Sequence, residues 1–368
     1  MNIPEFLALL VFGLRDLFKF RTLVFIMSLT IAIATTMYMF LEVYRSGLAA
    51  QFNEPATNLL VIHDSQNVGD ISGSRVSGDV SELLSSMGIS MLIPEIRAVT
   101  GTSVQNATLL RGIDLAKYTS LESFSMLSGH RLKPDDPPRQ AMVGALLAET
   151  QGLSVGDKIS LRGRNFSIVG IFENGTYMDN QAWISLADAQ VLLGWEKDVS
   201  VFIIPDEGIL QEGDMLPGNL SVSRKGEDLR LISAQYEPLL RLWQIVALAL
   251  GIAASLTLAN VLWRLAWLRR HEIAILRTVA FSTPSIVGYL LIQAAGVTLL
   301  GLLLGGLFMM ILVTSTRLTV SSLTIVPQLE AFTLLANLGA VGLIVLAGSL
   351  IPAWWLSHLN LAQLLRSE

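Results

Sequence analysis

Four stretches of the chain are long, apolar and free of charged side chains, and more polar segments separate them. They span residues 22–41, 242–263, 286–314 and 331–351. An α-helix rises about 1.5 Å per residue, so about 20 apolar residues cross the roughly 30 Å hydrocarbon core of a bilayer. The pattern therefore predicts four transmembrane helices.

Residues 42–240, between the first two apolar stretches, show a mixture of short patterns instead. Residues 227–240 favour a helix that continues into the second span, and Arg162-Gly163-Arg164-Asn165 is typical of a hairpin turn. We expect surface loops at 64–78 and 133–139, where Ser, Gly, Asp and Pro are frequent. Runs rich in β-branched and aromatic residues predict strands at 59–63, 159–161, 166–171, 183–186 and 199–204, and helix-forming composition predicts helices at 80–87, 145–151 and 187–193. The predicted fold is an α-helical membrane protein with four transmembrane helices and a large α/β extracytoplasmic domain inserted between helices 1 and 2.

Basic residues set the predicted orientation. They precede the first span in residues 1–21, which have the pattern of an amphipathic helix, and they fill residues 264–285. The short outer loop at 315–330 contains Arg317 as its basic residue, whereas the C-terminal segment 352–368 contains Arg366. Because Lys and Arg concentrate in cytoplasmic loops, both termini are predicted to be cytoplasmic and residues 42–240 extracytoplasmic. The predicted location is the inner or plasma membrane, with several passes.

Composition excludes several classes of function. Only 15% of the residues are charged, and the net charge is -5. Residues 43–240 hold 24 acidic and 15 basic side chains, so a nucleic-acid surface is not expected. There is no cysteine and no phosphate-binding loop motif, and His63 and His130 lack metal-ligand spacing, so each is interpreted as a surface or loop histidine. We expect no catalytic residue, no metal site and no cofactor in this chain.

Small residues mark candidate helix-packing positions. Gly251 and Ser255 belong to a four-residue repeat on the second span, and Gly301 and Gly305 form a G-x-x-x-G motif on the third. Such spacing lets two helix backbones approach closely. The alternative is that Gly and Ala are simply common in membrane helices.

The outer end of the first span carries a candidate substrate contact. Tyr38 and Glu42 are four residues apart and share a helix face. An acid at the membrane boundary would hold a cationic head group or a haem iron. The alternative is an aromatic residue of the membrane interface beside a charged end marker, which needs no ligand.

The cytoplasmic segment 269–285 is predicted to contain a short amphipathic helix. Apolar residues on one face would enter a groove of a partner protein, while charges on the other face fix the register. The alternative is a basic loop that sets the topology and has no partner. The candidate docking residues are Arg269, Arg270, Glu272, Ile273, Leu276 and Arg277.

This segment, Arg269-Arg270-His271-Glu272-Ile273-Ala274-Ile275-Leu276-Arg277, resembles the signature of FtsX-like and MacB-like ABC transporter permeases of the mechanotransmission type. Three further stretches support the resemblance: the basic approach to the first span at 15–23, the run from Gly129-His130-Arg131-Leu132 to Phe166-Ser167-Ile168-Val169-Gly170, which is similar to the MacB periplasmic core domain, and the ending from Pro352 to Arg366. The resemblance extends over almost the whole chain.

The resemblance implies a non-catalytic permease subunit that acts as a homodimer. A separate cytoplasmic ATPase dimer would bind ATP and Mg and dock on residues 269–277. The machine would export or extract an amphipathic cargo such as a lipid, lipoprotein, peptide, drug or haem. The alternative is an FtsX-like transducer that activates an extracellular partner such as a cell-wall hydrolase. Membrane lipids and a periplasmic adaptor are further expected partners, and nucleic acid is not.

Overall fold

The computed structural model divides the chain into two compact units. The helical unit comprises Met1–Ser46, Leu239–Thr316 and Pro327–Glu368, and the sheet unit comprises Gly47–Pro238 and Arg317–Val326. The residues described are 11, 15, 19, 21–52, 58–67, 73–101, 107–118, 124–268, 283–316, 318–320, 323–329 and 331–357.

Long helices make up the helical unit: α2 (Arg21–Gln51), α7 (Glu227–Leu268), α9 (Thr283–Ser315) and α10 (Ala331–Ser357). Within the described residues, three segments are long and apolar enough to cross a membrane, namely Arg21–Gln51, Arg241–Arg264 and Val287–Ser315. The apolar part of α10, Leu334–Leu350, is shorter. The count of four spans therefore stays a prediction.

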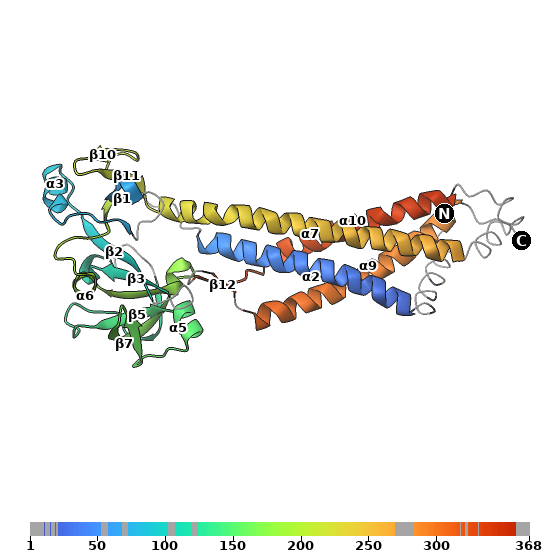
Figure 1. Cartoon of the computed structure of the whole chain (residues 1–368), viewed down its shortest axis with the longest axis horizontal. Coiled ribbons are helices and arrows are strands. Elements are labelled where there is room, and N and C mark those ends of the chain that lie inside the picture. The colour runs from blue at the N-terminus through green and yellow to red at the C-terminus, as the bar shows by residue number, and fades with distance from the viewer. Residues whose placement is uncertain are drawn as a thin grey trace, which may run out of the picture. The chain divides into compact units, whose positions relative to one another are not determined.

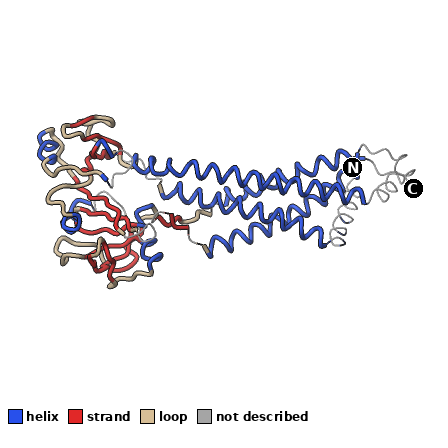
Figure 2. Tube along the Cα trace, viewed as in Figure 1, coloured by secondary structure: helices blue, strands red, loops and turns tan. Residues whose placement is uncertain are grey.

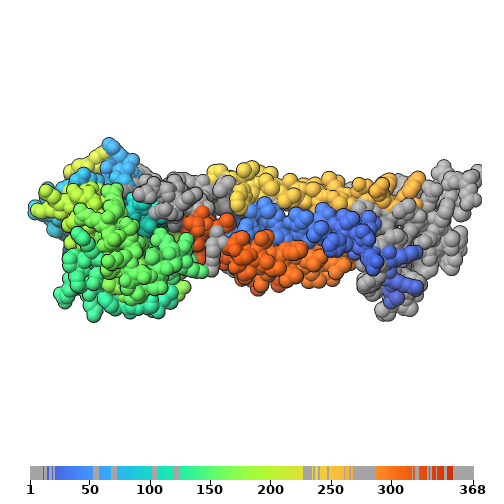
Figure 3. Space-filling view, turned by 60° about the horizontal axis from the view of Figure 1, so that its bottom comes forward, coloured from blue at the N-terminus to red at the C-terminus, as the bar shows by residue number. Residues whose placement is uncertain are grey.

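The four helices share one apolar core. They run side by side (Figure 1), and on the face shown in Figure 3, α2 lies between α7 and α9. Each helix contributes small or branched side chains, which allow close packing without a hydrophobic driving force between helices. The buried members are Val24, Met27, Ile31, Ala34, Ala254, Leu258, Leu262, Ala294, Val297 and Val341.

Helix α7 is continuous from the end of the sheet unit into the helical unit. It contains 42 residues and keeps its helical assignment through Pro238. This confirms the prediction that residues 227–240 form a helix that runs on into the second span. Proline has no backbone N–H, so α7 lacks one backbone hydrogen bond at Pro238.

The sheet unit is built on one mixed sheet (Figure 2). Its strand order is β10-β11-β1-β9-β2-β3-β8-β5-β7-β4, and β6 pairs with β7. The pairs β3–β8 and β5–β7 are parallel and the others are antiparallel. The strands are β1 (Leu59–Asp64), β2 (Ile93–Thr100), β3 (Thr108–Ile113), β4 (Ser125–Gly129), β5 (Gln140–Gly144), β6 (Lys158–Leu161), β7 (Arg164–Glu173), β8 (Gln181–Ser185), β9 (Val201–Pro205), β10 (Met215–Leu216) and β11 (Leu220–Arg224).

Short helices flank this sheet: α3 (Val80–Ser86), α4 (Leu115–Tyr118), α5 (Ala145–Gln151), α6 (Leu186–Leu193) and the 3-10 helices η1 (Ser65–Asn67) and η4 (Tyr177–Asn180). The predicted helix at 145–151 is confirmed with its bounds, and α3 and α6 differ from prediction by one residue. Helix α6 packs directly on β3, where a Cβ added at Gly112 would collide with the Cβ of Ala189.

The predicted hairpin turn is confirmed between β6 and β7. Leu161 pairs with Arg164, which leaves Arg162 and Gly163 as a two-residue loop. Both loop residues have positive φ, 46° and 78°, as this tight connection requires. All five predicted strands exist, but six strands of this sheet were not predicted: β2 and β3 at the centre of the sheet, and β4, β5, β10 and β11.

Two polar residues that were expected at the surface are buried instead. His63 lies in β1 and is 2% exposed, with Nε2 3.3 Å from the Ser221 hydroxyl. Ser74, in the predicted surface loop 64–78, is 0% exposed and donates to the carbonyl oxygen of Ser200 at 2.7 Å. The prediction was wrong for both because Ser221 in β11 and Ser200, directly before β9, supply hydrogen-bond partners that make burial favourable. His130 is exposed, as predicted.

The predicted outer loop at 315–330 contains a small β-hairpin. Strand β12 (Leu318–Val320) pairs antiparallel with β13 (Leu323–Ile325). The hairpin belongs to the sheet unit, although α9 and α10, which precede and follow it, belong to the helical unit.

Candidate sites in the helical and sheet units

The six candidate docking residues lie outside the described residues. Helix α7 ends at Leu268 and α9 begins at Thr283, so Arg269, Arg270, Glu272, Ile273, Leu276 and Arg277 fall between them. Their role as a coupling site stays a prediction.

The glycines of the third span lie against α2. A Cβ added at Gly301 would stand 2.6 Å from the Cβ of Ile31, and one added at Gly305 would stand 2.7 Å from the Cβ of Thr35. The hydroxyl of Ser28 in α2 also reaches the carbonyl oxygen of Val297, at 3.3 Å. The two helix backbones therefore approach closely along this line, and larger residues would push them apart.

The small residues of the second span have a different neighbour. Ser255 is 9% exposed and faces α10, where a Cβ added at Gly348 would collide with its hydroxyl. Gly251, one helical turn earlier, is also buried. The small-residue stripe of α7 thus includes a close contact with α10.

At the end of the first span, Glu42 of the candidate substrate contact is paired with a basic residue of the same helix. Tyr38 is partly buried against the apolar core of the helical unit. Glu42 forms a salt bridge with Arg45 on the same helix, and the Arg45 Nε donates to its Oε2 at 3.0 Å. Close by in sequence, the Tyr44 hydroxyl donates to the carbonyl oxygen of Thr316 at 3.0 Å. A cationic ligand at Glu42 would therefore compete with the Arg45 guanidinium.

A buried charge cluster lies in the centre of the sheet unit. Glu95 in β2 is 0% exposed, and the Nε of Arg111 in β3 lies 2.9 Å from its Oε1. Arg97 donates to the same carboxylate. Burial alone would raise the pKa of Glu95, but the two guanidinium groups outweigh burial and lower the pKa to about 2. The carboxylate is therefore ionised at neutral pH.

Aromatic rings surround the Arg111 end of this cluster. The guanidinium carbon lies 5.2 Å from the ring centroid of Tyr118 and 5.6 Å from that of the buried Trp183. Cation–π attraction of this kind helps to keep a buried guanidinium charged. Sequence reasoning missed the cluster because charged residues in β2 and β3 hide the apolar pattern of buried strands.

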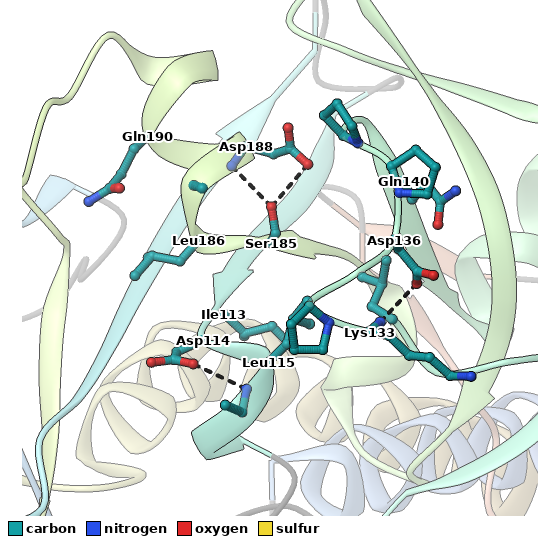
Figure 4. A pocket seen from close by; sticks show the side chains of 16 residues that line it. Ile113, Asp114, Leu115, Lys133, Asp136, Gln140, Ser185, Leu186, Asp188 and Gln190 are labelled. Atoms are coloured by element: carbon teal, nitrogen blue, oxygen red, sulfur yellow. Dashed lines mark hydrogen bonds between the residues drawn. The ribbon is translucent and has the colours of Figure 1, made fainter.

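An open cleft of about 490 Å³ lies on the sheet unit, beside the starts of α4 and α6 and the proline-rich loop 133–139 (Figure 4). Three carboxylates line it, and each accepts a hydrogen bond from nearby backbone. Asp114 accepts from Ala116 N, Asp136 from Lys133 N and Asp188 from Arg139 N, at 2.8 to 3.1 Å. These carboxylates stabilise their own loops and helix starts. Within the described residues, no group of three His, Asp or Glu side chains is placed to hold a metal ion.

Comparison with known proteins assigns the chain to a family. The model of the MacB-like periplasmic core domain matches residues 22–212, which is more than half of the chain. Two solved structures are similar. The first is the periplasmic region of MacB from Actinobacillus actinomycetemcomitans, at 12% identity and a TM-score of 0.33, and the match covers 50% of this chain and 94% of that chain. The second is a domain of a protein described as a permease from Porphyromonas gingivalis, at 12% identity and a TM-score of 0.29, and the match covers 45% of this chain and 88% of that chain. No curated protein sequence matches the chain. The chain therefore belongs to the family of the MacB-like periplasmic core domain, as a membrane protein of the ABC transporter permease type.

Proposed function

We propose that the chain is the permease subunit of an ABC transporter, non-catalytic by itself, that works as a homodimer with a separate ATPase dimer. The ATPase binds ATP and Mg in the cytoplasm and hydrolyses the nucleotide. Four spans carry the resulting movement to the periplasmic sheet unit, which exports or extracts an amphipathic cargo. Both termini and residues 264–285 face the cytoplasm in this proposal.

Helix α7 is the observation that carries the proposal. It begins at Glu227, shortly after β11 ends at Arg224, and it ends at Leu268, next to the candidate docking segment. With 42 residues it is about 63 Å long at 1.5 Å per residue. Because one hydrogen-bonded rod joins the two places, displacement of the docking segment would be delivered to β11 and, through strand pairing, to β1.

Tyr38 and Glu42 are proposed as cargo contacts. Arg45 already neutralises Glu42, so a cationic cargo group would take over the carboxylate as Arg45 turns away. The side chain of Arg45 is 40% exposed and that of Glu42 is 13% exposed. The Arg45 guanidinium is thus the more accessible partner, and it can turn away while Glu42 stays in place.

The docking assignment is tested with charge reversals in the complex with the cognate ATPase. Arg277→Glu and Glu272→Arg should weaken ATPase binding more than about tenfold, which corresponds to about 1.4 kcal/mol. Lys158→Glu is the matched control, because Lys158 is exposed in β6 of the sheet unit. Normal ATPase binding and stimulation in both reversals would show that residues 269–277 are not the docking site.

The molecule that co-purifies with the chain distinguishes a transporter from a signal transducer. Mass spectrometry and a visible absorption spectrum of the gently purified complex should show a stoichiometric amphipathic molecule. A transmembrane transducer would instead retain an extracellular protein and no small molecule, and that result would replace the transport proposal.

A further inference from the structure

Thr324 carries hydrogen bonds from the β12–β13 hairpin to the core of the sheet unit. Thr324 in β13 is 4% exposed. Its backbone N–H donates to Asn180 Oδ1 at 2.8 Å, and Asn180 Nδ2 donates to its carbonyl oxygen at 3.4 Å. The Asn180 amide thus pairs with both backbone groups of Thr324, as a neighbouring peptide group would in a sheet. Asn180 itself is 1% exposed, so water does not compete for these bonds.

A second segment reaches the same carbonyl oxygen. Gln51, the last residue of α2, donates from Nε2 to the carbonyl oxygen of Thr324 at 3.0 Å, and Gln51 is 4% exposed. The next residue, Phe52, stacks on Tyr177 of η4 with ring centroids 6.1 Å apart. The C-terminal end of α2 is therefore held by both the hairpin and η4.

The Thr324 side chain adds contacts with two hydroxyl groups. Its Oγ1 lies 3.1 Å from the Oγ1 of Thr150 in α5 and 3.1 Å from the Oγ1 of Thr319 in β12. Residues from α2, α5, η4 and both hairpin strands therefore converge on one position. We call Gln51, Thr150, Asn180, Thr319 and Thr324 the Thr324 clamp.

Asn180 is held in place by its own surroundings. The neighbouring Asp179 carboxylate accepts from the backbone N–H groups of Asn174 and Gly175, at 2.7 and 2.8 Å. A Cβ added at Gly144 would collide with the backbone of Asp179, so η4 packs tightly on the end of β5. The Asn180 amide is thus presented by a fixed backbone, and this preorganisation makes its pairing selective for one hairpin position.

We propose that the Thr324 clamp is a third mechanical connection between the membrane helices and the sheet unit, additional to α2 and α7. Asn180 is the positioning residue that keeps the clamp closed throughout the ATPase cycle. The hairpin joins α9 to α10, and both helices would move with the ATPase. A closed clamp would pass their movement to η4 and α5 of the sheet unit, whereas an open clamp would let the hairpin slip. The proposal rests on the proposed function, because it assigns a path for the same motion.

Asn180→Asp tests the clamp with almost no change of shape. It replaces the amide donor by a carboxylate oxygen that faces the Thr324 carbonyl oxygen at a position that is 1% exposed. Gln51 still donates to that carbonyl oxygen, but two facing acceptors and a buried charge favour opening by about tenfold or more. Asn165→Asp is the matched control, because Asn165 is exposed in β7. The readout is hydrogen exchange of the sheet unit in the full complex, without nucleotide and after trapping with ATP and vanadate.

A covalent link supplies the second measurement. The chain contains no cysteine, so Thr150→Cys with Thr324→Cys introduces a single thiol pair. The two side chains already touch, so oxidation should close this pair nearly completely, with or without ATP. The difference in hydrogen exchange of the sheet unit between the nucleotide-free and the vanadate-trapped complex is called the nucleotide response. In the Asn180→Asp background, formation of the disulfide by oxidation should restore the nucleotide response that the reduced form has lost. A merely destabilised fold would not be rescued in this way.

The outcomes separate the two proposals. Loss of the nucleotide response in Asn180→Asp, its retention in Asn165→Asp and its rescue by oxidation would support the clamp. A normal response in Asn180→Asp, a loss that oxidation does not rescue, or poor crosslinking during ATP turnover would overturn it. If the unsubstituted complex shows no nucleotide response in the sheet unit, the proposed function itself fails, and the clamp proposal fails with it.

Discussion

The hydroxyl of Thr36 in α2 donates a hydrogen bond to the carbonyl oxygen of Gly305 in α9, at 3.0 Å. The same hydroxyl also donates to the carbonyl oxygen of Ala32 in its own helix, at 2.7 Å. Gly305 places no side chain between the two helix backbones, which lie close together at this position. Gly305 therefore permits both the close packing and the polar contact.

Gly305→Ala should destabilise the helical unit. The added methyl group would stand 2.7 Å from the Cβ of Thr35 and 2.8 Å from the carbonyl oxygen of Ala32, so the helices must separate. Overpacking of this kind costs about 1–3 kcal/mol. Gly306→Ala is the matched control, because a Cβ at Gly306 meets nothing within 4 Å. Thermal unfolding in detergent should show a lower midpoint for Gly305→Ala alone. Equal midpoints for the two variants would contradict the close packing of α9 against α2 at Gly305.

Glu95→Gln should strongly destabilise the sheet unit. It leaves the buried Arg111 without its carboxylate, and breaking a buried ion pair costs about 3–5 kcal/mol. Chemical unfolding followed by tryptophan fluorescence measures the change. Glu196→Gln, at an exposed position, should have little effect. Similar stability of both variants would mean that the buried pair contributes nothing.

The same carboxylate predicts a pH dependence with a definite sign. The pKa of Glu95 is lowered from 4.5 to about 2 on folding, so its ion pairs stabilise the fold above pH 4.5. That contribution should be lost progressively as the pH falls from 4.5 toward 2. Stability of the unsubstituted chain should therefore fall more steeply in this window than stability of Glu95→Gln. Parallel curves would contradict the assignment.

The orientation is testable because the chain has no cysteine. A thiol at Ser90→Cys should react with an impermeant reagent added outside the cell, since Ser90 is exposed in the sheet unit. A thiol at Ser282→Cys should react only after the membrane is opened. Ser74 is unsuitable for this purpose because it is buried. The reverse pattern of labelling would invert the proposed topology.

The Glu42–Arg45 pair gives opposite expectations for its two members. If a cationic cargo group displaces Arg45, Arg45→Gln frees the carboxylate and should raise the amount of co-purified cargo, whereas Glu42→Gln should lower it. Quantitative mass spectrometry of the purified variants decides the matter. Equal amounts of co-purified cargo in both variants would show that Glu42 does not bind the cargo, and the binding site would then be expected on the sheet unit.

The sequence alone determined the features that depend on neighbours along the chain. Charge-free stretches predicted the long apolar helices, because crossing a bilayer requires a continuous run of about 20 such residues. The absence of any strong stop other than Pro238 predicted that residues 227–240 would continue as a helix into the second span. The residues Arg162-Gly163-Arg164-Asn165 predicted the hairpin turn between β6 and β7. Each of these signals lies within a few residues of the structure that it specifies.

Only the tertiary structure decided where polar residues are buried. Ser74 lies in a segment with the composition of a surface loop, and His63, Glu95 and Arg111 are polar residues within strands. All four are at most 2% exposed. The pairing of Asn180 with Thr324 joins positions separated by 144 residues. A polar group can be buried only when a partner satisfies its hydrogen bonds or its charge, and here the partners come from strands and helices that are distant in sequence. No local pattern contains that information, because the three-dimensional arrangement of the sheet and hairpin brings each partner into reach.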